Sequence, residues 1–178
     1  MSEAIIGERE ERELDGTTTR YDEVSVLGDT VERLMRELFS EHWAGITVGP
    51  LIQGAVFEIR FGAQPKISMS DGYLTVDPGS WHFHLCVNDH RGTPSPELAR
   101  LRRVARAAFF RTEGGSHGGG ASTPTWGLRL WNGRGEQMLT VLFPNPYYDD
   151  DWRLLKEPRW EKAALWETLR RRYAGTPA

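Results

Sequence analysis

The chain has 178 residues, 22 lysines and arginines against 25 aspartates and glutamates, and a formal net charge of −3. This length fits one domain, and the nearly balanced charge argues against a dedicated nucleic-acid-binding protein, which usually has a strongly basic surface. The one cysteine excludes an internal disulfide framework, and no apolar run approaches the roughly 18 residues of a membrane span. Because the acidic N-terminus lacks the pattern of a secretory signal, we expect a cytoplasmic protein.

The N-terminal segment, residues 1–20, is polar and charged and has no sustained apolar period. We therefore expect a disordered tail there, followed by a single folded domain over residues 21–178. An amphipathic helix is predicted next, starting at Asp29 or Thr30, either of which can cap it, and ending near Trp43. Its apolar residues at helical spacing are Val31, Leu34, Met35 and Leu38.

The middle of the chain predicts short antiparallel strands. Residues 55–61 alternate apolar and polar side chains, as a half-buried strand does. The dipeptide Asp71-Gly72 predicts a hairpin turn between two further strands, and another strand covers residues 81–87. Two late strands, residues 126–131 and 137–143, flank a second turn of the same kind.

Helices are predicted on either side of the late strands. Ser95 is a candidate cap for a second helix, which we expect to extend to about Arg111. A third helix is predicted over residues 160–173, where leucines lie one turn apart. Helices at both ends and hairpins between them indicate an α+β fold, with a large, mainly antiparallel sheet and flanking helices.

The strand over residues 81–87 carries the strongest chemical signal. Alternate side chains of a strand face opposite sides. One side is apolar and is expected in the core: Trp81, Phe83, Leu85 and Val87. The other side presents His82, His84 and Cys86, about 6.5–7 Å apart along the strand. These are good ligands for a metal or for heme iron, and His90 lies just beyond them, in a turn.

Several short motifs follow one another in an order that resembles a known family. Residues 27–61 contain a helix, a tryptophan and glycine corner, a strand, and then a strand that ends in Glu-Ile-Arg. Residues 71–75, 83–85 and 130–142 continue the likeness with short aromatic, histidine and Asn-Gly motifs. Together these motifs span about residues 27–145 and resemble the cytoplasmic heme-utilisation carrier family of Gram-negative bacteria.

The resemblance implies a broad antiparallel sheet with flanking helices, assembly into a homodimer, and heme binding. It also implies a role for a strand histidine of the family, which matches His84. A second heme-associated histidine of some members corresponds to Gln53 here, and the Arg-Asp pair after the last strand is replaced by Pro144-Asn145-Pro146.

From these patterns we predict a protein that binds or traffics heme or a related tetrapyrrole. His84 is the expected axial ligand, and His82 or Cys86 is a neighbouring or alternative ligand. Arg103 and Arg106, which we place on the second predicted helix, are candidates for contacts to the heme propionates, because guanidinium groups bind carboxylates in bidentate fashion.

Two alternatives remain open. His82, His84 and either Cys86 or His90 could hold a single non-heme iron or zinc ion in an enzyme. In the third reading the protein is a metal-free interaction module whose histidine face forms a dimer interface. Visible absorption after addition of heme, followed by elemental analysis, distinguishes these three hypotheses.

Overall fold

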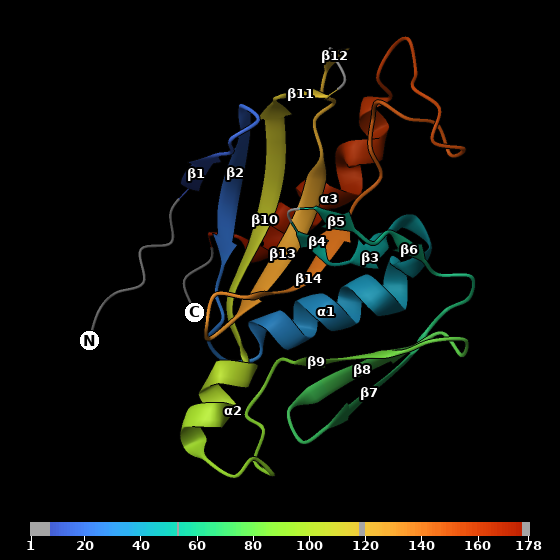
Figure 1. Ribbon diagram of the computed structural model, residues 1–178. Coiled ribbons are helices and arrows are strands. Elements are labelled where there is room, and N and C mark those ends of the chain that lie inside the picture. Colours follow the sequence, from blue (N-terminus) through green and yellow to red (C-terminus); the bar gives the residue numbers. More distant parts are fainter. Residues whose placement is uncertain (1–7, 53, 118–119, 176–178) are drawn as a thin grey trace.

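The computed structural model describes residues 8–52, 54–117 and 120–175. Its main feature is a seven-stranded antiparallel sheet with the strand order β1-β2-β10-β13-β14-β3-β6 (Figure 1). The strands in this order are β1 (Glu8–Arg12), β2 (Thr17–Val24), β10 (Val104–Gly114), β13 (Trp126–Asn132), β14 (Gln137–Leu142), β3 (Thr47–Gly49) and β6 (Ile59–Arg60).

A separate three-stranded antiparallel sheet has the order β7-β8-β9. It consists of β7 (Lys66–Ser70), β8 (Tyr73–Asp77) and β9 (Phe83–Cys86). Two short hairpins complete the strands: β4 (Leu51–Ile52) with β5 (Ala55–Val56), and β11 (Ser116–His117) with β12 (Gly120–Ala121). The helices are α1 (Thr30–Glu41), η1 (Trp43–Gly45), α2 (Pro96–Arg102), η2 (Trp160–Ala163) and α3 (Ala164–Tyr173).

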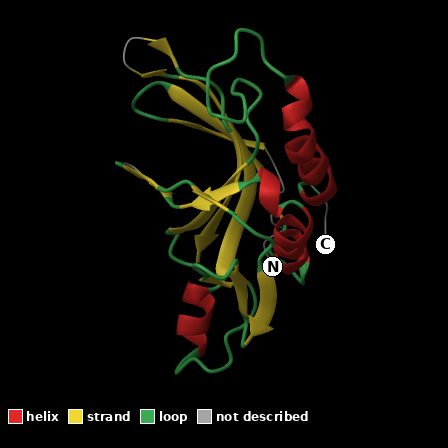
Figure 2. Cartoon of the chain, turned by 90° about the vertical axis from the view of Figure 1, so that its right-hand side faces the viewer, coloured by secondary structure: helices red, strands yellow, loops and turns green. Residues whose placement is uncertain are grey.

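The core joins both sheets through α1. This helix is amphipathic, and its apolar side chains are fully or almost fully buried: Val31, Leu34, Met35, Leu38 and Phe39. They share one cluster with Leu128 of the large sheet, Leu74 of the small sheet and Leu169 of α3. Figure 2 shows α1 and α3 together on one side of the sheets, with α2 on the other. Burying each such side chain contributes about 1.5–3 kcal/mol.

The α+β architecture expected from the sequence is confirmed. The first helix starts at the expected residue, and the hairpin at Asp71-Gly72 is present as β7 and β8. Both turn residues have positive φ, 46° and 83°, which suits the mirror-image turns that join twisted strands. The third helix is also present, as η2 and α3. None of the helices within the described residues is long and apolar enough to cross a membrane.

The expectation of a disordered tail over residues 1–20 is wrong for residues 8–20, because β1 and most of β2 lie there. β1 is a charged edge strand, and backbone pairing and cross-strand ion pairs such as Arg20 with Glu10 hold it in place. Charged side chains on an edge strand discourage pairing with other molecules. Such a strand lacks the apolar alternation from which strands are predicted. Residues 1–7 lie outside the described chain.

The expected second helix is wrong beyond Arg102, where α2 ends. Val104 begins β10, a central strand that is buried on both faces. Ala107 and Phe109 pack into the main core, whereas Ala108 and Phe110 pack on the opposite face of the sheet. A continuous apolar run of this kind fits a helical period as well as a strand period, so the pattern alone could not separate them.

The strand expected over residues 55–61 is present only in part, as β5 and β6 separated by Phe57 and Glu58. Phe61 is buried in the core, but Phe57 and Ile59 are exposed. The alternating segment is therefore divided between the β4–β5 hairpin and the edge of the large sheet.

Candidate functional site

Strand β9 places its side chains on two faces of the small sheet. Leu85 is buried in the core, next to Leu74 of β8. His84 faces outward, directly opposite Thr75 in the ladder, and His82 is exposed as well. The local sequence explains this arrangement, because apolar residues at alternate positions fix which face of the strand is buried.

The two exposed histidines lie close together. Their ring centroids are 5.1 Å apart, with 67° between the ring planes. The Nδ1 atom of His84 lies 2.8 Å from the hydroxyl oxygen of Thr75, so a hydrogen bond joins them. The other ring nitrogen of His84, Nε2, is the atom left to bind a ligand.

Cys86 shares this face of the strand, but it is only 1 % exposed. Its thiol donates to the backbone carbonyl of Asn88 at 3.4 Å and has a hydrogen bond with Tyr73. Burial raises the pKa of the Cys86 thiol, which disfavours the thiolate that binds metals. The structure thus covers the sulfur while it leaves the two histidines open.

His90 lies in the loop after β9, beyond the strand as expected. Its Nε2 lies 3.3 Å from the carboxylate of Asp71, and its Nδ1 lies 3.2 Å from the guanidinium of Arg102. The carboxylate of Asp71 also accepts hydrogen bonds from the backbone N–H groups of Gly92 and Arg91, which lower the pKa of Asp71. Both ring nitrogens of His90 therefore have partners.

The two arginines that we proposed for anionic groups are paired with carboxylates. Arg103 donates to Asp89 at 2.8 Å and to the backbone carbonyl of Val26 at 3.3 Å. Arg106 forms a bidentate pair with Glu23, with Nη2 2.7 Å from one carboxylate oxygen and Nε 3.3 Å from the other. Any other anion at these sites must compete with these carboxylates.

An apolar arm projects from the large sheet. The β4–β5 arm comprises residues 50–57, of which Gln53 lies outside the described chain. The backbone N–H of Phe57 donates to the carbonyl of Pro50 at 3.1 Å and closes the base of the arm. Gly49 permits this closure, because a Cβ there would lie 1.9 Å from the carbonyl oxygen of Phe57. The exposed large apolar side chains of the arm and of β6 are Ile52, Val56, Phe57 and Ile59.

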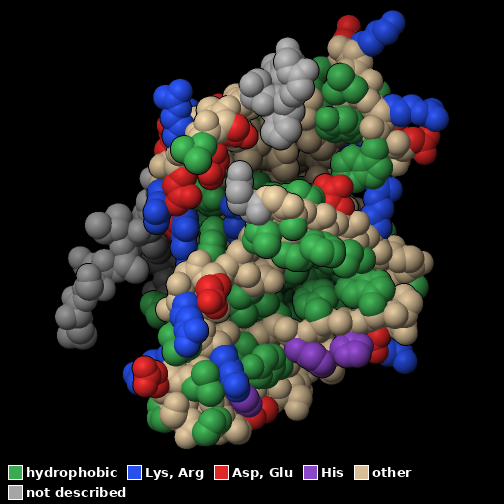
Figure 3. Space-filling model, in the orientation of Figure 1, with side chains coloured by type: hydrophobic (Ala, Val, Ile, Leu, Met, Phe, Trp, Pro, Cys, Tyr) green, Lys and Arg blue, Asp and Glu red, His purple; other side chains and the backbone are tan. Residues whose placement is uncertain are grey.

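A cluster of four aromatic rings connects β6 to β9. Phe61 lies 5.1 Å from Trp81 between ring centroids, and Trp81 stacks on Phe83 at 6.2 Å. Phe39 of α1 supports Phe83 at 5.6 Å. Trp81 and Phe83 are only half-buried. Figure 3 shows hydrophobic side chains gathered between the arm and β9, with histidine side chains along the lower border. We call this surface the apolar face.

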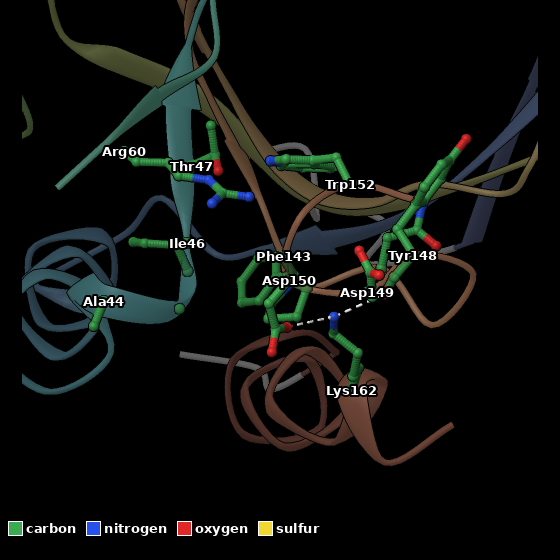
Figure 4. Close-up of a pocket in the computed structure, with 13 residues that line it drawn as sticks. Ala44, Ile46, Thr47, Arg60, Phe143, Tyr148, Asp149, Asp150, Trp152 and Lys162 are labelled. Carbon is green, nitrogen blue, oxygen red and sulfur yellow. Dashed lines mark hydrogen bonds and ion pairs between the residues drawn. The ribbon is translucent and has the colours of Figure 1, made fainter. Parts of the chain in front are cut away.

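The sequence patterns missed a cleft of about 220 Å³ between β3 and the loop that follows β14 (Figure 4). The guanidinium of Arg60 lies 4.7 Å from the ring centroid of Trp152. Lys162 donates to the carbonyl of Tyr148 at 2.8 Å and to the carboxylate of Asp150 at 2.9 Å. The hydrogen bond from Lys162 lowers the pKa of Asp150. Pockets for larger organic ligands typically measure about 300–1,000 Å³, so this cleft suits only a small polar molecule.

Within the described residues, one group of three histidine or acidic side chains has all its potential ligand atoms within 4.8 Å of one another: Glu37, Glu41 and His42. Glu37 is already engaged there, because it pairs with Arg172 and accepts a hydrogen bond from the hydroxyl of Tyr173 at 2.6 Å. The strand residues proposed from the sequence do not form such a group. Two of them, His82 and His84, are adjacent, whereas Cys86 is buried and His90 is held elsewhere.

Comparisons with known proteins give one family and one fold. The chain matches, over residues 8–175, the family described as "Family of unknown function (DUF7676)". No curated protein matches. A solved structure described as "Structure of the Heme Binding Protein ChuX" has a TM-score of 0.50 and 17% identity, covering 84% of this chain and 74% of that chain.

A second structure, described as "Crystal structure of ChuX", has a TM-score of 0.47 and 15% identity, covering 87% of this chain and 78% of that one. At such identities the first likeness shows a common fold. The fold expected from the sequence resemblance is therefore confirmed, whereas the family that matches by sequence is a different one.

Proposed function

The chain belongs to the DUF7676 family, and we propose that it binds heme or a related tetrapyrrole on the apolar face, with His84 as the axial ligand. The observation that carries this proposal is the apolar face itself, with exposed apolar side chains of the arm and histidine side chains along its border (Figure 3). An exposed apolar surface rimmed by polar groups is typical of a binding site. The description of the ChuX structure as a heme-binding protein supports the same reading at the level of the fold.

The residues of the apolar face fit the chemistry of the ligand. Phe57 of the arm and the half-buried rings of Trp81 and Phe83 can cover a macrocycle that lies over the edge of β9, because Trp81 and Phe83 point to the opposite side of this segment from His84. Heme, when bound, supplies an iron centre that takes an imidazole nitrogen as a ligand. His84 offers Nε2 for this purpose, and His82 is placed beside it as a neighbouring or alternative ligand.

For the propionates we propose Arg103 in preference to Arg106. The carboxylate that pairs with Arg103 belongs to Asp89, whose side chain is 79 % exposed, so a ligand carboxylate can replace it at little cost. The partner of Arg106 is Glu23, which is 23 % exposed and forms a bidentate pair that is harder to displace.

We further propose that the protein is a homodimer and that it carries heme in trafficking or utilisation. The exposed arm and the free edge of β9 leave apolar surface and unpaired backbone groups that a second copy can cover. Sedimentation at micromolar concentration should give about twice the chain mass of 20.2 kDa. A single species at the chain mass would contradict the dimer and would leave the heme proposal standing.

The second candidate is a single metal ion without heme, such as iron or zinc. Two imidazoles that share an ion at metal–nitrogen distances of about 2 Å have ring centroids about 5–6 Å apart. The centroids of His82 and His84 are 5.1 Å apart, which fits that geometry. This reading requires a further ligand from the substrate or from water, because Cys86 is covered.

A hemin titration followed at the Soret band tests the proposal. We expect saturable binding by the unmodified protein, loss of the shifted band in His84→Ala, and weaker binding with a changed spectrum in His82→Ala. His42→Ala is the matched control, because His42 follows α1, where its Nε2 lies 3.9 Å from the carboxylate of Glu37. Equal hemin binding by His84→Ala would overturn the assignment. Stoichiometric metal that both strand variants lose equally, with no heme binding, would favour the second candidate.

A further inference from the structure

Thr75 lies directly opposite His84 in the ladder between β8 and β9. Its hydroxyl oxygen is 2.8 Å from Nδ1 of the histidine. Threonine is branched at Cβ and therefore has few side-chain rotamers, so its hydroxyl is held in a fixed direction on the strand. The histidine ring is restricted on another side by His82, at 5.1 Å between ring centroids. Two neighbours thus fix the orientation of this imidazole before any ligand arrives.

The identity of the bonded nitrogen decides what the ring can bind. A neutral imidazole carries one proton, on Nδ1 or on Nε2, and the hydrogen bond of one nitrogen sets the state of the other. If Nδ1–H donates to the Thr75 oxygen, Nε2 has a free lone pair that points away from the strand. A metal-ligating histidine commonly donates its second N–H in this way, which fixes the ring and increases its basicity as a ligand.

We propose that Thr75 is a positioning residue for His84: its hydroxyl accepts the Nδ1 proton and so selects Nε2 as the ligating nitrogen. The inference rests on the proposed function for its consequence in ligand binding, whereas the proton position is a property of the unliganded protein. It also favours His84 over His82 as the main ligand, because the Thr75 hydroxyl holds the ring of His84.

Two substitutions isolate the hydroxyl. Thr75→Val keeps the shape of the side chain and removes the oxygen, and Thr75→Ser keeps the oxygen. Ser68→Ala is the matched control, because Ser68 is exposed on β7 and lies opposite Thr75 on its other side. All three variants should unfold at the same urea concentration as the unmodified protein, since these positions are on the surface.

The first measurement is nitrogen NMR of the histidines in the unliganded protein. We expect His84 with its proton on Nδ1 in the unmodified protein and in Thr75→Ser, and a mixture of the two tautomers in Thr75→Val. A proton on Nε2 in the unmodified protein would overturn the inference. This result does not depend on heme, so it separates a failure of the positioning role from a failure of the proposed function.

The second measurement is hemin affinity. Loss of an outer-shell hydrogen bond typically weakens metal binding about 10–100-fold, and we expect a loss in this range for Thr75→Val. Thr75→Ser should recover most of the affinity, and Ser68→Ala should bind as the unmodified protein does. Equal hemin affinity in Thr75→Val and the unmodified protein would refute the positioning role. If the unmodified protein binds no hemin, the proposed function fails, and the NMR result alone decides the role of Thr75.

Discussion

The two sheets have outer faces of opposite character. On the large sheet, Arg106 lies between the rings of Trp131 and Tyr21, with its carbon centre 4.1 and 4.8 Å from the ring centroids, and it pairs with Glu23. Arg129 lies 4.6 Å from the ring centroid of Phe110 and donates to the hydroxyl of Tyr21. At the small sheet, His84 of β9 and His82, just before this strand, are exposed, and within the described chain only Nδ1 of His84 is held, by the Thr75 hydroxyl at 2.8 Å.

This difference shows how similar residue types serve different purposes. The arginines of the large sheet are stacked and paired within the chain, so they stabilise the fold. The histidines of the small sheet keep binding capacity that the chain does not use, which is what a ligand requires. The number of basic residues in a segment is therefore a poor guide to a ligand site, whereas the partners of each residue are a good one.

The largest expected effect tests the structural role of the large sheet's outer face. Phe110 is fully buried and supports both Arg129 and Tyr21. We expect Phe110→Ala to lower the free energy of unfolding by about 3–5 kcal/mol in urea titrations. Hemin affinity of the folded protein should not change. If Phe110→Ala has normal stability but binds no hemin, the outer face of the large sheet, and not the small sheet, would be the ligand site.

Removal of the paired arginine should have the next largest effect. Arg106→Ala leaves Glu23 without its bidentate partner, and a lost hydrogen bond to a charged group costs about 1.5–3 kcal/mol. Chemical denaturation measures this loss. The double variant Glu23→Ala with Arg106→Ala should recover part of it, since no unpaired carboxylate remains. A stability equal to that of the unmodified protein would show that the pair is only a surface contact.

The arm gives a test of the small sheet's side of the comparison. Phe57 is 57 % exposed, so Phe57→Ser should leave the unfolding free energy unchanged. Hemin affinity should fall about tenfold, which is about 1.4 kcal/mol, through lost apolar contact. Isothermal titration calorimetry gives both affinity and stoichiometry. The control Leu14→Ser removes another exposed apolar side chain, from the turn between β1 and β2, and should have no effect.

A smaller loss is expected at the proposed propionate contact. Asp89, the partner of the half-buried Arg103, is exposed, and such charge pairs near the surface contribute about 0.2–1 kcal/mol. Arg103→Ala should therefore weaken hemin binding by less than Phe57→Ser does, and more at low salt than at high salt. If the hemin affinities of the unmodified protein and of Arg103→Ala are both independent of salt, Arg103 does not contact the ligand.

The smallest expected effect is a loss of stability that appears only at alkaline pH. Burial and the hydrogen bond to Glu37 raise the pKa of Tyr173 to about 12 from its ordinary value of 10.0. The folded state thus favours the protonated phenol, so this contribution to stability is complete below pH 10 and is lost as the pH rises to about 12. Unfolding free energies measured across this range should fall, and Tyr173→Phe should fall less. Equal pH profiles would contradict the shift.

Local patterns predicted the parts of the fold that depend on neighbours in sequence. The helical period of α1, the turn at Asp71-Gly72 and the alternation in β9 are of this kind. β1 was missed because it is a charged edge strand without apolar alternation, although it pairs with the neighbouring β2. β10 was missed because its apolar run also fits a helix, and its pairing with β2, which is distant in sequence, makes it a strand. For the site, the alternation placed His84 outward, but only tertiary packing buries Cys86. The approach of Arg60 to Trp152 joins two distant segments, so no spacing rule could reveal it.

The covered thiol of Cys86 can also report on the opening of the small sheet. The chain has one cysteine, and its buried thiol is hydrogen-bonded with Tyr73, on the strand that carries His84. A thiol reagent can reach it only when β8 and β9 separate or the neighbouring loop lifts. The rate of alkylation therefore measures how often this strand pair opens. A ligand bound at His84 should slow the alkylation of Cys86.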